Sequence, residues 1–178
     1  MRIAVAGGTG TVGHHVTRTA REAGHEVVVL SRRHGVDVGT GVGVAAALAG
    51  ANAVVDVTST MTLSRKKATA FFETGTRTLL DAEARAGVGH HVVLSIVGID
   101  GIDAGYYGAK LAQERAVAEG RVPHSIVRAA QFHEFAGQVM SMVSGPFAVA
   151  PRTLMRPVAA REVAAHLLRV VEGGPVGR

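Results

Sequence analysis

The stretch Gly7-Gly8-Thr9-Gly10-Thr11-Val12-Gly13 decides the fold of this 178-residue chain. Before it lies a short apolar run at residues 2–6, which is typical of a buried strand. After it, apolar residues recur at helical spacing over residues 12–23, and Gly24 is placed to end that helix. A second β-rich run follows at residues 26–30. This order predicts one strand–helix–strand unit of about 30 residues.

The glycines stand where such a unit needs them to bind a dinucleotide. Gly7 allows a sharp turn off the strand, Gly10 allows the backbone to approach a pyrophosphate, and Gly13 allows the helix to pack tightly. The free N–H groups at the helix start then hold the phosphates. A tight glycine turn without a ligand is the alternative, but the flanking strand and helix favour a dinucleotide-binding loop.

The rest of the chain continues the alternation of strands and helices. We expect further strands at residues 36–38, 53–57, 91–94 and 123–128, and helices at residues 40–49, 64–86, 106–119 and 161–172. The fold class is therefore α/β, a doubly wound Rossmann-type parallel sheet with helices on both faces. At this length we expect a single NAD(P)-binding domain over residues 1–178, in which residues 132–178 form a short or incomplete substrate-side cover.

Composition narrows the possible classes of protein. The absence of cysteine excludes disulfides and thiolate chemistry, and the nine histidines form no chelating pair, so we expect no metal site. The net charge of +5 is scattered and aromatic residues are few, which argues against nucleic acid binding. Residues 38–55 carry no charged side chain, but their glycines indicate a helix, a turn and a strand rather than a membrane span. With the first strand starting at residue 2, we expect a cytoplasmic protein.

Two positions indicate how the dinucleotide is bound. Arg32 and Arg33 follow the second strand, where an arginine pairs with a 2′-phosphate and an acid would bind the 2′-hydroxyl. We therefore expect NADP, with NAD possible, and an ordinary charged loop as the alternative. Thr58 and Ser59 lie at the carboxyl end of the strand at residues 53–57 and should face the dinucleotide, cap the next helix, or both.

Ser95, Tyr106 and Lys110 carry the predicted chemistry. Tyr106 and Lys110 are spaced i, i+4 and share a helical face, so the ammonium should lower the pKa of the phenol and can also contact ribose hydroxyls. Such a tyrosine exchanges a proton with a carbonyl oxygen during hydride transfer. Ser95, at the end of the preceding strand, can hydrogen-bond the same oxygen. A surface tyrosine packed over a lysine stem is the alternative.

These residues together resemble the short-chain dehydrogenase/reductase superfamily. The resemblance is carried by residues 7–13, 94–95 and 126–132 and by Tyr106 with Lys110, and it is greatest for the atypical, NmrA-like, NAD(P)-binding branch. It implies that Gly7, Gly10, Thr11, Val12 and Gly13 hold the pyrophosphate, Arg32 the adenosine end, Asp37 the adenine, Thr58 the ribose linkage, and Ala129, Gln131 and Phe132 the nicotinamide.

The expected function is an NADP-preferring oxidoreductase that passes hydride between the nicotinamide and a small apolar carbonyl or quinone-like acceptor. Met140 and Met142, in an uncharged segment, suggest an apolar cover over the substrate. One alternative is a non-catalytic dinucleotide sensor, the only case in which we expect a protein partner. The other is a relative of sugar-nucleotide epimerases and dehydratases, although such enzymes need a substantial C-terminal substrate region.

Overall fold

The computed structural model describes residues 1–62, 64–102, 104–134 and 156–177. Its centre is a parallel sheet of five strands in the order β2-β1-β3-β4-β5. The strands are β1 (Arg2–Ala6), β2 (Glu26–Leu30), β3 (Ala53–Asp56), β4 (His90–Ile96) and β5 (His124–Ala129). Because β1 pairs with both β2 and β3, the strand order reverses at β1, where a doubly wound sheet binds its ligand.

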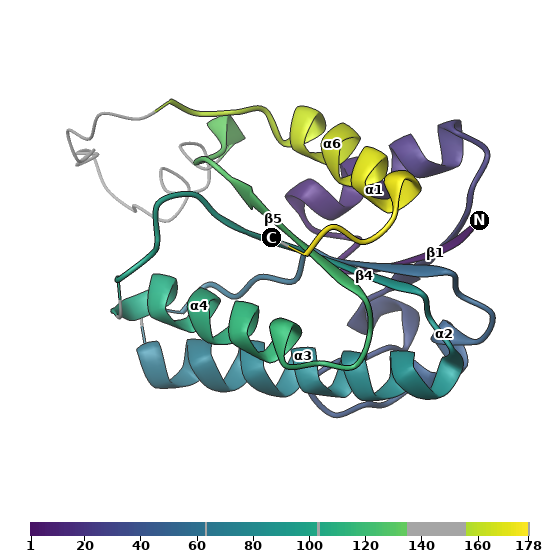
Figure 1. Cartoon of the computed structure of the whole chain (residues 1–178), viewed down its shortest axis with the longest axis horizontal. Coiled ribbons are helices and arrows are strands. Elements are labelled where there is room, and N and C mark those ends of the chain that lie inside the picture. Colours follow the sequence, from purple (N-terminus) through teal and green to yellow (C-terminus); the bar gives the residue numbers. More distant parts are fainter. Residues whose placement is uncertain (63, 103, 135–155, 178) are drawn as a thin grey trace.

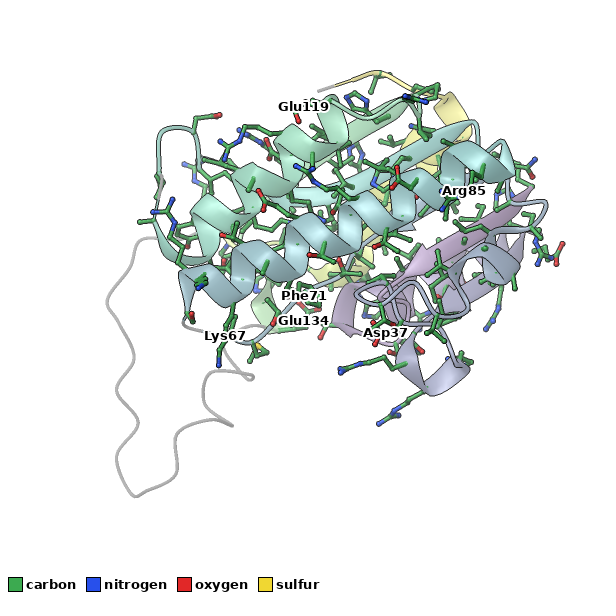
Figure 2. The ribbon with its side chains drawn as sticks, turned by 90° about the horizontal axis from the view of Figure 1, so that it is seen from below. Asp37, Lys67, Phe71, Arg85, Glu119 and Glu134 are labelled. Carbon is green, nitrogen blue, oxygen red and sulfur yellow. The ribbon has the colours of Figure 1, made fainter. Side chains whose placement is uncertain are left out.

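Helices cover both faces of this sheet (Figure 1). One face carries α1 (Thr11–Glu22) and α6 (Ala160–Gly173), and the other carries α3 (Arg65–Ala86) and α4 (Gly105–Ala118). Two short elements, the 3-10 helix η1 (Arg32–His34) and α2 (Val44–Leu48), complete the described helices. Figure 2 shows α3 and α4 side by side, with Lys67 near the start of α3 and Arg85 near its end. The predicted fold class is confirmed.

Residues 36–38 do not form the predicted strand, so this prediction is wrong. The amide of Val36 donates to Ser31 O at 3.1 Å and that of Asp37 to Val42 O at 2.9 Å, so the backbone is used in local turns instead of a sheet ladder. Gly35, with φ +73°, bends the chain away from β2 just before this segment. The helix expected at residues 40–49 is likewise reduced to α2, because Gly43 starts it in the left-handed region.

The helix ends follow the expected signals. Ser64 precedes α3 and accepts a hydrogen bond from the Lys67 amide at 3.4 Å, while Gly87 ends the helix in the left-handed conformation. At the start of α6, the Glu134 carboxylate accepts a hydrogen bond from the Ala160 amide at 3.1 Å. Within the described ranges, no helix combines the length and the apolar character needed to cross a membrane.

Candidate active site

The glycine loop is pressed between the carboxyl ends of β2 and β3. The Gly7 amide donates to Leu30 O at 3.1 Å, and the φ of Gly7 is +78°, a conformation that favours glycine. A Cβ on Gly7 would lie 2.9 Å from Val57 O and 3.0 Å from the Thr58 amide nitrogen. The sharp turn predicted at Gly7 is therefore present, and it places the loop directly against the residues that follow β3.

The start of α1 is packed equally closely on this loop. A Cβ on Gly13 would lie 2.1 Å from Gly7 O, so only glycine allows the first helical turn to approach. Gly10 is the N-cap of α1 and is exposed, as is Thr11, whereas the Val12 side chain is buried in the core. Only the backbone of Val12 can therefore meet a ligand. This cradle of close-packed glycines at an exposed helix start fits a dinucleotide pyrophosphate.

The residues expected at the adenosine end follow β2. Arg32 and Arg33 lie in η1 and are both exposed, two and three residues beyond the Leu30 carbonyl that the glycine loop contacts. Asp37 is half-buried, and its Oδ1 accepts a hydrogen bond from the Gly39 amide at 2.8 Å. The Asp37 carboxylate thus shapes its own turn, and its contact with the adenine stays a prediction.

Tyr106, in the first turn of α4, meets the segment that follows β3. Its hydroxyl shares a hydrogen bond with Ser59 Oγ at 3.0 Å, and its ring packs edge-on against Phe72 with 5.5 Å between the centroids. Burial raises the pKa of Tyr106, and the nearby Asp56 carboxylate raises it further, while the hydrogen bond from Ser59 lowers it. The lowered pKa predicted from the spacing to Lys110 is therefore wrong, and the phenol is held in its protonated form.

Lys110 is buried one turn further along α4, with 4% of its surface exposed. Its ammonium donates to Leu94 O at 2.7 Å and to Gln113 Oε1, and lies 4.7 Å from the centroid of the Phe72 ring. Burial lowers the pKa of Lys110 to about 8, although the charges of Asp56 and Glu114 act to raise it. The ammonium therefore titrates close to neutral pH.

Ser95 lies near the carboxyl end of β4. Its hydroxyl is buried, with 3% of the residue exposed, and finds no hydrogen-bond partner within the described part of the chain. It follows Leu94, whose carbonyl accepts the Lys110 hydrogen bond. A buried hydroxyl without a partner is uncommon, because its desolvation is not offset. The unpartnered Ser95 hydroxyl is compatible with the predicted binding of a ligand oxygen, which stays a prediction.

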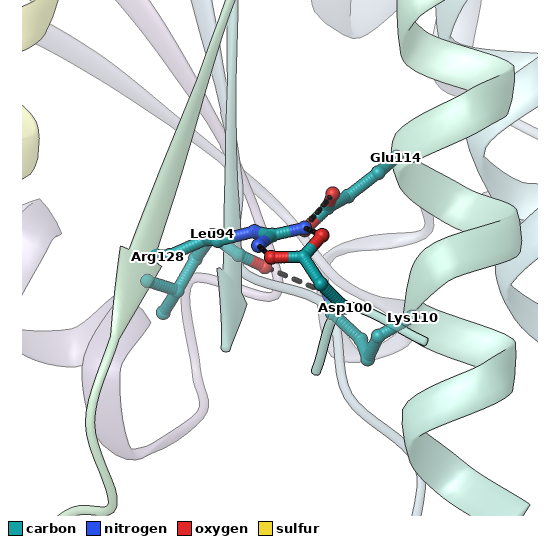
Figure 3. A network of polar contacts seen from close by, with 5 residues as sticks. All are labelled: Leu94, Asp100, Lys110, Glu114 and Arg128. Carbon is teal, nitrogen blue, oxygen red and sulfur yellow. Dashed lines mark hydrogen bonds and ion pairs between the residues drawn. The ribbon is translucent and has the colours of Figure 1, made fainter. Parts of the chain in front are cut away.

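Arg128 and two carboxylates join β5 to α4 and to the loop before α4 (Figure 3). Arg128 of β5 donates to Glu114 of α4 through Nε at 2.8 Å and Nη2 at 2.6 Å. Its Nη1 also donates to Asp100, in the loop between β4 and α4, at 2.5 Å. Both carboxylates raise the pKa of Arg128. The bidentate pairing ties the second half of α4 to β5, and the contact with Asp100 ties the loop before α4 to the same strand.

The predicted nicotinamide contacts lie at the end of β5. Ala129 is buried and Phe132 packs against the same apolar cluster beneath α6. Gln131 is half-buried, and its carbonyl accepts a hydrogen bond from the Val158 amide at 2.9 Å. Their predicted contact with the nicotinamide stays a prediction. Met140 and Met142 lie outside the described residues.

Two buried residues were missed by sequence reasoning. Asp56 and Gln113 are each 1% exposed and connect Lys110 to the end of β3. Asp56 carried a signal, because it is the only charged residue in the apolar run at residues 53–57. Gln113 carried none. Among the described residues, no group of three or more histidines and carboxylates is arranged to hold a metal ion.

A glycine loop at the reversal of a parallel sheet, next to a tyrosine and a lysine on one helix, defines a protein of the short-chain dehydrogenase/reductase class. Comparison with family models agrees. The chain belongs to the NAD dependent epimerase/dehydratase family, whose model matches residues 3–119. It is accordingly an NAD(P)-dependent enzyme of this class, while the NmrA-like branch stays a prediction.

Solved structures show the same fold at low sequence identity. UDP-N-acetylglucosamine 4-epimerase from Bacillus cereus matches with a TM-score of 0.75 and 20% identity, over 100% of this chain and 76% of that one. A dTDP-glucose 4,6-dehydratase from Streptomyces venezuelae, solved with NAD bound, matches with a TM-score of 0.78 and 22% identity, over 99% and 74%. A dTDP-4-dehydrorhamnose reductase from Clostridium acetobutylicum gives 0.78 and 18%, over 97% and 71%. None of the curated proteins matches the chain.

Proposed function

We propose that this protein transfers hydride between NADP(H) and a small apolar carbonyl or quinone-like acceptor. One observation carries the proposal: the Tyr106 hydroxyl is hydrogen-bonded to Ser59, at 3.0 Å, in the segment against which the glycine loop is packed. A proton donor is thus joined directly to the wall of the dinucleotide site. Exposed apolar side chains on the segments after β3 and β4, Met61 and Val97, support an apolar acceptor.

The residues divide the chemistry between them. When bound, the nicotinamide supplies the hydride. Tyr106, whose raised pKa keeps it a phenol, gives its proton to the acceptor oxygen as the hydride arrives, so that a carbonyl becomes an alcohol or a quinone becomes a hydroquinone. Ser95 directs its unpartnered hydroxyl to the same oxygen. Lys110 holds the ribose and stabilises the phenolate that Tyr106 leaves behind.

The acceptor proposal is tested by following NADPH oxidation with a panel of carbonyl and quinone acceptors. Tyr106→Phe removes the proton donor but keeps the ring packing against Phe72, so we expect kcat to fall by about 10²–10⁴-fold. NADPH affinity, measured by calorimetry, should stay within about twofold. A Tyr107→Phe variant is the matched control, since Tyr107 is exposed on the same helix. A Tyr106→Phe enzyme as active as wild type would contradict the proposal.

The preference for NADP rests on Arg32 and Arg33. Both guanidinium groups are exposed just beyond β2, in a segment without an acid before Asp37. Replacing both with alanine should weaken NADPH binding by about 10-fold or more, because charge-assisted hydrogen bonds contribute about 1.5–3 kcal/mol. NADH binding should change much less. Equal losses for the two dinucleotides, measured by calorimetry, would exclude a contact with the 2′-phosphate.

A sugar-nucleotide epimerase or dehydratase is the second candidate, and the family match favours it. Such an enzyme would use Tyr106 and Lys110 in a transient oxidation of a hexose, with no net change in the dinucleotide. Incubation with UDP- and dTDP-hexoses, followed by chromatography of the sugars, separates the two functions. Epimerised or dehydrated product without NADPH consumption would replace the first proposal. Tight NADPH binding without any turnover would favour the sensor.

A further inference from the structure

Lys110 is joined to a buried carboxylate through a single side-chain amide. Gln113 lies one turn after Lys110 on α4, and its Oε1 accepts a hydrogen bond from the Lys110 ammonium. Its Nε2 donates to Asp56 Oδ2 at 2.9 Å and also contacts Thr76 Oγ1 at 3.1 Å. Lys110, Gln113 and Asp56 are each at least 95% buried. Asp56 and Lys110 therefore interact through fixed partners rather than through solvent.

The direction of the Gln113 amide follows from the charge of Asp56. An ionised carboxylate only accepts hydrogen bonds, and an ammonium only donates them. The amide therefore has one orientation that satisfies both neighbours, with nitrogen toward Asp56 and oxygen toward Lys110. If Asp56 became a donor, either the contact to Asp56 or the contact to Lys110 would be lost. The carboxylate thus determines where the Lys110 ammonium finds its acceptor.

Asp56 also reaches the wall of the dinucleotide site. Its second oxygen, Oδ1, accepts a hydrogen bond from the Thr58 amide at 2.9 Å. Thr58 is the residue whose amide abuts Gly7, and the next residue, Ser59, holds the Tyr106 hydroxyl. One carboxylate is therefore connected to Lys110 on one side and to the partner of Tyr106 on the other.

We propose that Asp56 is a positioning residue for the dinucleotide site: it orients Gln113, which holds the Lys110 ammonium, and it fixes Thr58 and Ser59 beside Tyr106. The proposal rests on the proposed function, because it assigns Lys110 and Tyr106 to the bound dinucleotide and its acceptor. It adds two residues, Asp56 and Gln113, that touch neither the cofactor nor the substrate.

The charges around Lys110 give the proposal a measurable signature. Two carboxylates face the ammonium, Asp56 from β3 and Glu114 from α4, and both raise the pKa of Lys110 against the lowering by burial. Glu114 is itself paired with Arg128 of β5. Tyr106 lies one turn earlier on α4, and from α3 the uncharged Phe72 contacts Lys110 while Thr76 contacts Gln113. The Asp56 charge also raises the pKa of His91 in β4. Removing the Asp56 charge should therefore lower the pKa of Lys110.

The test measures that pKa directly in the ligand-free protein. The chain has three lysines, and Lys66 and Lys67 are exposed, so ¹³Cε signals of labelled lysine report Lys110 with two internal references. We expect Asp56→Asn to move the Lys110 titration to lower pH while the two reference signals stay in place. Thr76→Val is the matched control, because it removes a contact of Gln113 without changing charge, and it should leave the Lys110 titration unchanged.

A double variant distinguishes the loss of this linkage from a general loss of folding. In Asp56→Asn with Gln113→Glu, the asparagine can donate to the new carboxylate, and that carboxylate can accept from Lys110. Net charge and hydrogen-bond polarity are both restored, so the Lys110 titration should return to or above its wild-type pH. A titration that does not move in Asp56→Asn, or that stays low in the double variant, would overturn the role of Asp56.

NADPH calorimetry at pH 7.5 then tests whether the role of Asp56 extends to dinucleotide binding. We expect Asp56→Asn to bind NADPH about 10-fold more weakly, which corresponds to about 1.4 kcal/mol, and the double variant to recover most of that loss. Unchanged affinity in Asp56→Asn would refute its role in the dinucleotide site. If wild-type protein binds no NADPH while the Lys110 titrations shift as expected, the proposed function fails but the Asp56–Gln113–Lys110 linkage holds.

Discussion

The two faces of the sheet are covered by different helices (Figure 1), and they bury different kinds of side chain. The face under α1 and α6 is packed with a large apolar cluster that includes Val16, Val92 and Leu167. The face under α3 and α4 buries five titratable side chains, namely Asp56, Glu83, His91, Lys110 and Glu114. Burying each charge costs several kcal/mol that its partners only partly offset. The second face therefore places buried charges beside apolar clusters of its own, whereas the first face is mainly apolar.

The buried charged residues under α3 and α4 form two groups. Asp56, Lys110 and Glu114 lie toward the carboxyl ends of the strands, where the glycine loop and Tyr106 meet. His91 and Glu83 lie near the start of β4, and the His91 Nδ1 donates to both Glu83 oxygens at 2.9 and 3.0 Å. The pair is coupled to the candidate site through one charge, because the Asp56 carboxylate also acts to raise the pKa of His91. Substituting Glu83 measures what a buried charge contributes to stability, and the Lys110 titration followed alongside reports any effect on the candidate site.

The largest effect is expected from breaking this pair with Glu83→Gln. Burial lowers the pKa of His91, but the Glu83 charge and hydrogen bond outweigh it, so the net pKa is raised above 6.5. At pH 6, below the raised pKa, His91 carries its charge, and Glu83→Gln removes the group that contributes most to compensating it. We expect a loss of about 3–5 kcal/mol in the free energy of unfolding, measured by urea denaturation at pH 6.

The same pair gives the wild-type protein a defined pH dependence. A raised folded-state pKa means that the folded protein binds the His91 proton more tightly than the unfolded chain does. Its contribution is fully present below pH 6.5 and is lost as pH rises through the folded pKa. Urea midpoints should therefore fall from pH 6 upward in wild type, and less so in Glu83→Gln. Parallel pH curves for the two proteins would show that the pair is not the source.

Sequence patterns predict the elements that rest on local signals. The turn at the glycine loop and the helices expected at residues 64–86 and 161–172 follow from spacing, and the structure confirms them. The prediction of a strand at residues 36–38 was wrong because β-branched residues favour a strand only where a partner strand is available. Here local glycine turns capture the backbone amides first.

The candidate site was predictable only in part. The spacing of Tyr106 and Lys110 places them one turn apart on α4, as observed, but it says nothing about which partner each hydroxyl or ammonium finds. Tyr106 pairs with Ser59, and Lys110 with Leu94 and Gln113, because α3, α4 and the end of β3 converge on them. The sign of the Tyr106 pKa depends on this burial, which no spacing reveals.

A smaller and pH-independent loss is expected on the apolar face from Leu167→Ala. Leu167 is fully buried in α6 against the cluster of α1 and the sheet, so its truncation removes apolar contacts and leaves a cavity. We expect a loss of about 2–5 kcal/mol in the free energy of unfolding. Because the cavity involves no titrating group, the urea midpoint should keep the wild-type pH dependence at a lower value, and the Lys110 titration should not move. A change in that titration would mean that the two faces are coupled through the sheet, and that the charge placement under α4 depends on packing under α6.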